Sequence, residues 1–162
     1  MDRYLDTTRL GPMYLRRKDI ANIVATNLQR GVELGHYDPR AWVIMANHVH
    51  ALLLPKVSPE RLLGALKGCA AREANLVLGR TGQPFWQAES YDHWVRDARE
   101  LEKIVIYIEN NPVKAGFVTR PEDYPWSSAA KPAARDGRSP VAAGTSACAT
   151  STSEAPAHIS HA

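Results

Sequence analysis

The stretch that most constrains the fold is WVIMANHVHALLLP, residues 42–55. Apolar residues flank two histidines, His48 and His50, which are separated by one valine. Ala46-Asn47 forms a plausible tight turn, so the stretch predicts an antiparallel hairpin with strands over 37–45 and 48–54. Side chains at i and i+2 of a strand point to the same face. Both imidazoles are therefore expected to project together, either as nitrogen ligands of one divalent cation or as an acid-base pair.

Helical spacing of apolar residues precedes and follows this hairpin. The first helix is expected to begin at Asp19 and to end at Gly31 or Gly35. The second is expected over residues 61–78, with Ser58 as its N-cap.

Besides the two histidines, a second set of candidate functional residues lies in YIENNPVKAGFV, residues 107–118. It falls at the end of a third predicted helix, which begins at Asp97 or Ala98 and runs to about Asn111, where Pro112 ends it. Tyr107 and Asn111 are four residues apart and share one face of a helix. A phenol and a carboxamide that face the same way are a candidate nucleophile and a candidate third metal ligand.

Composition and sequence pattern argue against a membrane-spanning, secreted or disulfide-bonded protein. The chain has 162 residues, 44% of them hydrophobic, and a formal net charge of +3, which suits one mildly basic domain. There is no apolar run of membrane-spanning length and no signal-type N-terminus, so a cytoplasmic protein is expected. Cys69 and Cys148 lie far apart and indicate neither a disulfide framework nor a zinc knuckle. We expect a domain over residues 1–128 and a disordered Ala/Ser/Pro-rich tail over 129–162.

Several motifs occur in an order that resembles one family. WVIMANHVHALLLP is followed by LLGALKGCAAREAN, GQPFWQAESYDHWVRD, YIENNPVKAGFV and PEDYPWSS. Together they resemble the REP-associated tyrosine transposases of the HUH superfamily, which act on single-stranded DNA. The resemblance runs from about Tyr4 to Ser128.

The resemblance implies a fold, a reaction and a set of site residues. The fold is α+β, a ferredoxin-like antiparallel sheet with helices on one face. The reaction is metal-dependent cleavage and rejoining of single-stranded DNA beside a hairpin of a repetitive palindromic element, by a monomer or a homodimer. His48, His50 and Asn111 match the ligands of Mg²⁺ or Mn²⁺. Tyr107 matches the nucleophile that forms a 5′-phosphotyrosine and leaves a free 3′-OH.

Three alternatives stay open at this stage. Family members usually carry a strand before the segment that starts at Tyr4, and its absence here would favour a catalytically impaired or repurposed DNA-hairpin-binding protein. HVHALLL also resembles the histidine-triad nucleotide hydrolases, but Leu52 stands where their third histidine is needed. Taken alone, His48 and His50 are equally compatible with structural histidines, and Tyr107 with a packed helix tyrosine.

Some basic and aromatic side chains are candidates for DNA contact. Four basic residues would either reach phosphates or stay solvated: Lys67, Arg72, Arg96 and Lys114. Four aromatic residues would either stack on bases or, as we favour, pack in the core: Phe85, Trp86, Tyr91 and Trp94.

Overall fold

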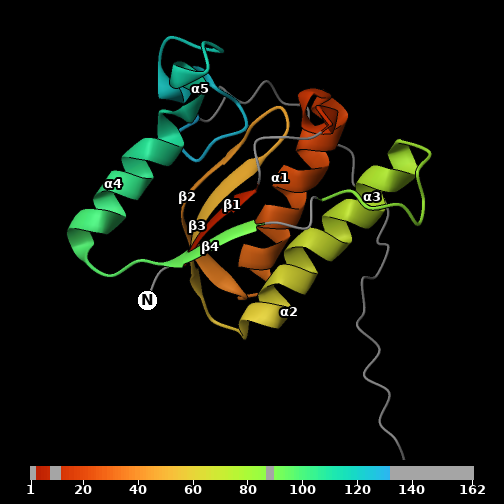
Figure 1. Cartoon of the computed structure of the whole chain (residues 1–162), viewed down its shortest axis with the longest axis horizontal. Helices are drawn as coiled ribbons and strands as arrows, with labels where there is room; N and C mark the ends of the chain where they lie inside the picture. The colour runs from red at the N-terminus through yellow and green to blue at the C-terminus, as the bar shows by residue number, and fades with distance from the viewer. Residues whose placement is uncertain (1–2, 8–11, 87–89, 132–162) are drawn as a thin grey trace, which may run out of the picture.

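The computed structural model describes residues 3–7, 12–86 and 90–131, with the backbone alone for the strands over 3–7 and 90–94. Of the tail predicted over 129–162, residues 132–162 lie outside the described residues. Four strands form one antiparallel sheet in the order β2-β3-β1-β4. They are β1 (Arg3–Thr7), β2 (Tyr37–Ile44), β3 (Val49–Pro55) and β4 (Ser90–Trp94). This order, with helical crossovers after β1 and β3, confirms the predicted ferredoxin-like α+β fold (Figure 1).

The expectation that the N-terminal strand is missing is wrong. Arg3–Thr7 forms β1, which lies between β3 and β4 and pairs with both. Arg3 stands opposite Leu53 in β3 and opposite Trp94 in β4. Short strands of mixed polarity carry little local signal, and pairing with neighbours on both sides decides their conformation. The sheet therefore has its central strand.

The hairpin forms as its apolar pattern predicts. Val43 stands opposite His50 and Ile44 opposite Val49. The amide of Met45 donates to the carbonyl of His48 at 2.8 Å, which closes the connection between the strands. The pairing shifts between Pro39 and Ala41, because proline has no amide to donate to the ladder.

Two helical crossovers cover one face of the sheet. The first is α1 (Lys18–Glu33). The second runs from α2 (Pro59–Leu63) through the π-helical turn η2 (Gly64–Gly68) into α3 (Cys69–Val77). Ser58 accepts a hydrogen bond from Arg61 N, which confirms it as the N-cap. The residues that form this layer of the core come from α1, the hairpin and α3, and include Ile20, Val24, Leu28, Ile44, Val49, Ala70 and Ala74.

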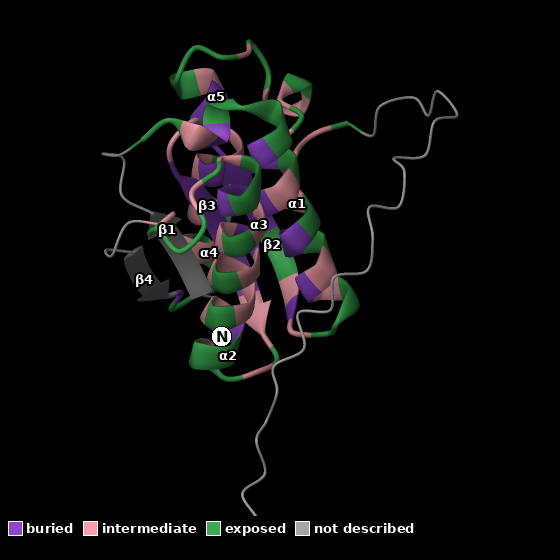
Figure 2. Ribbon diagram, turned by 90° about the vertical axis from the view of Figure 1, so that its right-hand side faces the viewer, coloured by how far each residue is buried: buried purple, intermediate pink, exposed green. Residues whose placement is uncertain are grey.

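The expectation that the helices cover one face of the sheet is wrong for the third helix, which lies on the face opposite the other two (Figure 1). It is α4 (Ala98–Glu109), and Asp97 caps it by accepting hydrogen bonds from the amides of Arg99 and Glu100. Its apolar side packs on alternate residues of the hairpin, and the buried members of this second core are Ala41, Val43, Met45, Leu52, Val95 and Ile108. Because side chains alternate along a strand, β2 and β3 supply both cores. Figure 2 shows buried residues on the hairpin and along one side of α1.

The chain after α4 closes the free edge of β2. The short helix α5 (Asn111–Lys114) and the 3-10 turn η3 (Pro121–Asp123) lead into this segment. Ser128 N donates to Trp42 O at 2.8 Å, and Ile44 N donates to Trp126 O at 2.9 Å. These bonds satisfy backbone groups that an open edge would leave unpaired.

Two of the aromatic candidates pack as core residues: Phe85 and Trp86 lie against the α1 layer. The side chains of Tyr91 and Trp94 lie outside the described residues. None of the helices in the described ranges has the length and apolar character needed to cross a bilayer.

Candidate active site

The hairpin turn brings the two histidines together. His50 lies in β3 and His48 directly before it, and both are buried on the α4 side of the sheet. Their ring centroids lie 4.7 Å apart with the planes at 83°. Val43, which stands opposite His50, is fully buried and belongs to the α4 core. The imidazoles are thus held by strand geometry and by packed aliphatic neighbours.

Asn47 orients one of these rings, a role that the sequence analysis missed. Its Oδ1 lies 2.8 Å from Nδ1 of His48. When Nδ1 carries the proton it donates to this oxygen, and Nε2 keeps its lone pair for a ligand. In the sequence, only the position of Asn47 directly before His48, in the predicted turn, could have indicated this role.

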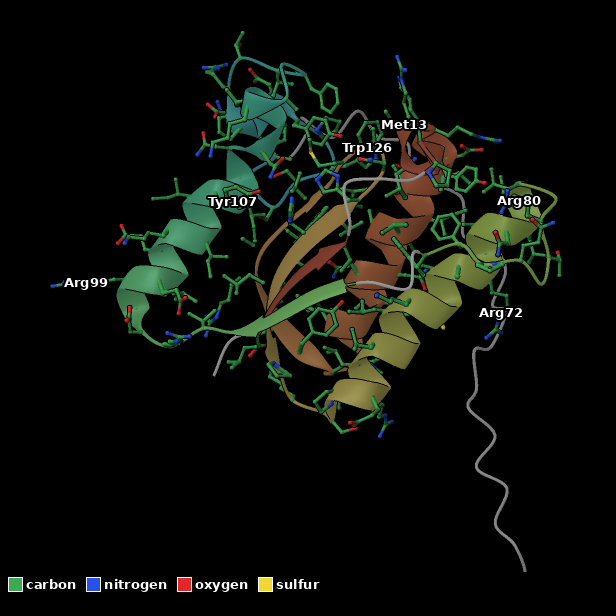
Figure 3. The ribbon with its side chains drawn as sticks, viewed as in Figure 1. Met13, Arg72, Arg80, Arg99, Tyr107 and Trp126 are labelled. Atoms are coloured by element: carbon green, nitrogen blue, oxygen red, sulfur yellow. The ribbon has the colours of Figure 1, made fainter. Side chains whose placement is uncertain are left out.

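Tyr107 reaches the histidines from α4. Its ring centroid lies 5.5 Å from that of His50, in an edge-to-face arrangement. Lys114 Nζ lies 4.8 Å from the centre of the same phenol ring. Figure 3 shows Tyr107 near the C-terminal end of α4, on the same side of the sheet as α5. The candidate nucleophile therefore has an imidazole and an ammonium group as neighbours.

Asn111 completes the group, although the helix does not continue to it as predicted. Asn110 caps α4, and a new turn, α5, starts at Asn111 with Pro112 in its first turn. Proline is tolerated there because the amide it lacks would have no helical partner. Asn111 is buried, and its Nδ2 lies 3.0 Å from Nε2 of His50.

The three predicted ligands fit a divalent cation. The described residues hold no cluster of three or more His, Cys, Asp or Glu side chains that suits a metal, so an amide would have to supply the third donor. A half-turn of the Asn111 amide exchanges Oδ1 with Nδ2 and presents oxygen at the position that now contacts His50. Two imidazole nitrogens and one amide oxygen with open positions suit Mn²⁺, and Mg²⁺ more loosely.

Of the four basic candidates, the structure brings only Lys114 to this site. Lys67 lies on η2 and Arg72 on α3, two elements that cover the opposite face of the sheet; Figure 3 labels Arg72. Partial burial lowers the pKa of the Lys67 ammonium group. Arg96 precedes the N-terminus of α4, and the helix rise separates that end from Tyr107 by roughly 14 Å. Any DNA contact of these three residues is remote from the phenol.

Comparisons with known proteins give two relevant similarities, and no family model matches the chain. A stretch of 43 residues is 42% identical to a Haemophilus influenzae protein provisionally named a REP-associated tyrosine transposase. This stretch covers 26% of the chain and only 24% of that protein. A solved structure of a REP-associated tyrosine transposase bound to a REP hairpin superposes with a TM-score of 0.58.

The chain resembles the REP-associated tyrosine transposases. The structural similarity covers 78% of this chain and 74% of the other, at 20% sequence identity, so it supports the fold. The short stretch of higher identity supports the resemblance in sequence. Both agree with the family resemblance read from the sequence.

Proposed function

We propose that this protein is a divalent-metal-dependent transposase that cleaves and rejoins single-stranded DNA beside a hairpin. One observation carries the proposal. Tyr107, His50 and Asn111 come from α4, β3 and α5, and their functional groups meet on one side of the sheet. A structural role for each residue separately gives no reason for a phenol, two imidazoles and a buried amide to gather at one point.

In the proposed reaction the chain supplies the nucleophile and its orientation. His48, His50 and Asn111 would hold a divalent cation, which would supply polarisation of the scissile phosphate and screening of its charge. The Tyr107 oxygen forms a bond to phosphorus, and the bond between phosphorus and the 3′ oxygen breaks. The phenol proton passes through solvent to the departing 3′ oxygen. The 5′ end stays on Tyr107 as a phosphodiester, so attack by a 3′-OH reverses the step and rejoins the strand.

The proposed substrate is single-stranded DNA that carries a hairpin of a repetitive palindromic element. The solved relative with the same fold is described as bound to a REP hairpin. We propose the same kind of partner here, bound by a monomer or a homodimer. The hairpin would be recognised by its shape, by backbone contacts and by a few base edges.

The alternative of a hairpin-binding protein without catalysis rested mainly on the expected loss of the N-terminal strand. Because β1 occupies the centre of the sheet, that reason no longer holds. The histidine-triad alternative is also disfavoured, since Leu52 is a fully buried core residue on the α4 side.

A covalent-adduct assay tests the proposed function. Hairpin strands from the DNA flanking the gene, labelled at the 3′ end that stays with the covalent fragment, are incubated with the protein and Mn²⁺ or Mg²⁺, then run on a denaturing protein gel. A labelled band at the mass of protein plus DNA is expected, and it should vanish with chelator and in Tyr107→Phe. Tyr14→Phe, on the opposite face of the sheet, is the matched control and should keep the band. Cleavage by Tyr107→Phe at the wild-type rate would mean that water is the nucleophile and would overturn the mechanism.

A further inference from the structure

One short segment after the nucleophile carries more than the predicted ligand. Asn111 opens α5 and contacts His50, and Lys114 ends α5 over the ring of Tyr107. Gly116 then turns the chain with a φ of 75°, and Phe117 N donates to Pro112 O at 3.0 Å. Phe117 is therefore held in a fixed place directly beyond the site.

Phe117 presents an aromatic ring to solvent. Its side chain is 52% exposed, and it is the one aromatic among the exposed large hydrophobic residues of the described ranges. The ring stacks on Tyr124, with centroids 6.1 Å apart and planes at 16°. Tyr124 is fixed in turn, because its hydroxyl donates to Ile44 O at 2.9 Å and its ring meets Trp126 edge-on at 5.8 Å. One side of the Phe117 ring is thus backed by a rigid aromatic neighbour, and much of the rest of the side chain is open to solvent.

We propose that Phe117 is a stacking platform for one base of the bound single strand, with Lys114 contacting the phosphate next to that base. This inference rests on the proposed function and adds a base-binding position to it. An aromatic ring beside a cation is the combination that single-strand binding surfaces use, because every base has a π-face and every nucleotide a negative phosphate. The ammonium group of Lys114 lies beside Tyr107, so the nucleotide on Phe117 is a neighbour of the one that is cut.

The position of Phe117 favours a nucleotide over a protein partner. Phe117 is the one exposed large hydrophobic residue of the described chain from α5 onward, and it follows the exposed Lys114 by three residues. A platform of this kind holds the strand without reading its sequence. Its expected role is to fix the single strand so that the scissile phosphate faces Tyr107.

A binding experiment on the full chain tests the platform separately from the chemistry. The background is Tyr107→Phe, which stops cleavage. The probes are hairpin strands from the DNA flanking the gene, each with 2-aminopurine at one position of the single-stranded arm. We expect the fluorescence of one position to be quenched on binding. Phe117→Ala should abolish that quenching and weaken binding about tenfold, whereas Phe117→Trp should keep both.

Leu76→Ala removes another exposed apolar side chain, from α3, and is the matched control, expected to change neither signal. Unchanged affinity and quenching in Phe117→Ala would overturn the platform. If the wild-type chain nevertheless forms the covalent adduct, only the platform is rejected and the proposed function stands. Quenching that depends on Phe117 without any adduct would support the platform and reject the chemistry. If no strand binds at all, both proposals are rejected.

Discussion

The side-chain amide of Asn111 lies 3.0 Å from Nε2 of His50, across 61 residues of sequence. Two local features create this contact. The hairpin turns His50 toward α4, and the break at Asn110 starts a new helical turn at Asn111. Because both side chains are buried, breaking this contact would leave a buried polar atom without a hydrogen-bond partner, which costs free energy. Two of the three proposed metal ligands are therefore already in contact.

Asn111→Ala should weaken Mn²⁺ binding at least tenfold, because it removes the oxygen donor and leaves two imidazoles. Isothermal titration of the folded protein measures this directly. Asn111→Asp is the control, since a carboxylate of the same length supplies oxygen and should bind Mn²⁺ at least as tightly as the wild type. Circular dichroism checks that each variant is folded. If His50→Ala weakened binding and Asn111→Ala did not, Asn111 would not be a ligand.

Lys114→Gln should slow the formation of the covalent adduct about tenfold at saturating DNA, which corresponds to about 1.4 kcal/mol in the barrier. The ammonium group lies 4.8 Å from the centre of the Tyr107 ring, where it stabilises negative charge that develops between phenol and phosphate. Lys103→Gln removes an exposed cation from α4 and serves as the control. A slowing that is equal in both variants would point to general attraction of DNA instead.

Local signals predicted most elements of this fold. Apolar spacing gave the helices, the N-cap at Ser58 lies where its side chain suggested, and the third helix begins at Ala98, within its predicted start. The i and i+2 rule placed His48 and His50 on one face. These features depend on residues close together in the chain, so periodicity and capping chemistry are sufficient to find them.

The features that were missed depend on distant contacts. Arg3–Thr7 becomes a strand because β3 and β4 pair with it from both sides. The apolar residues of α4 pack on one side of the β2-β3 hairpin, and this contact decides which face of the sheet the helix covers. The sequence of the helix alone does not predict that face. Pro112 predicted the end of the third helix. The first turn of a new helix, α5, also tolerates proline, because the amide that proline lacks has no helical partner there.

Gly31→Ala should lower the free energy of unfolding by about 1 to 2 kcal/mol, although alanine is the better helix former. A Cβ at residue 31 would lie 2.5 Å from the ring of Tyr37, which is itself buried and bonded to Leu28 O. Gly64→Ala is the control, since nothing lies within 4 Å of the added methyl group. That variant should be neutral or more stable by roughly 0.5 to 1 kcal/mol. Urea denaturation compares the two, and equal effects would contradict the close packing of Tyr37 on α1.

The stability of the fold should fall above pH 10 because of one buried phenol, Tyr37, and one half-buried phenol, Tyr124. Burial raises the pKa of Tyr37 and of Tyr124 above the ordinary value of 10.0. Above that pH the unfolded chain releases these phenol protons while the folded chain keeps them. The unfolded state then binds fewer protons, so the free energy of unfolding decreases as pH rises, by up to about 1.4 kcal/mol per pH unit for each group.

Tyr37→Phe isolates this effect. At pH 8 the variant should be less stable than the wild type by about 1 kcal/mol, because it loses the hydrogen bond from the phenol to Leu28 O. Between pH 10 and 12 its stability should decline less steeply, so the two curves converge. Urea denaturation at pH 8, 10, 11 and 12 measures both curves, and Tyr124→Phe should flatten the decline in the same direction. Parallel curves for wild type and Tyr37→Phe would show that the Tyr37 phenol ionises equally in both states, which would contradict its burial between α1 and β2.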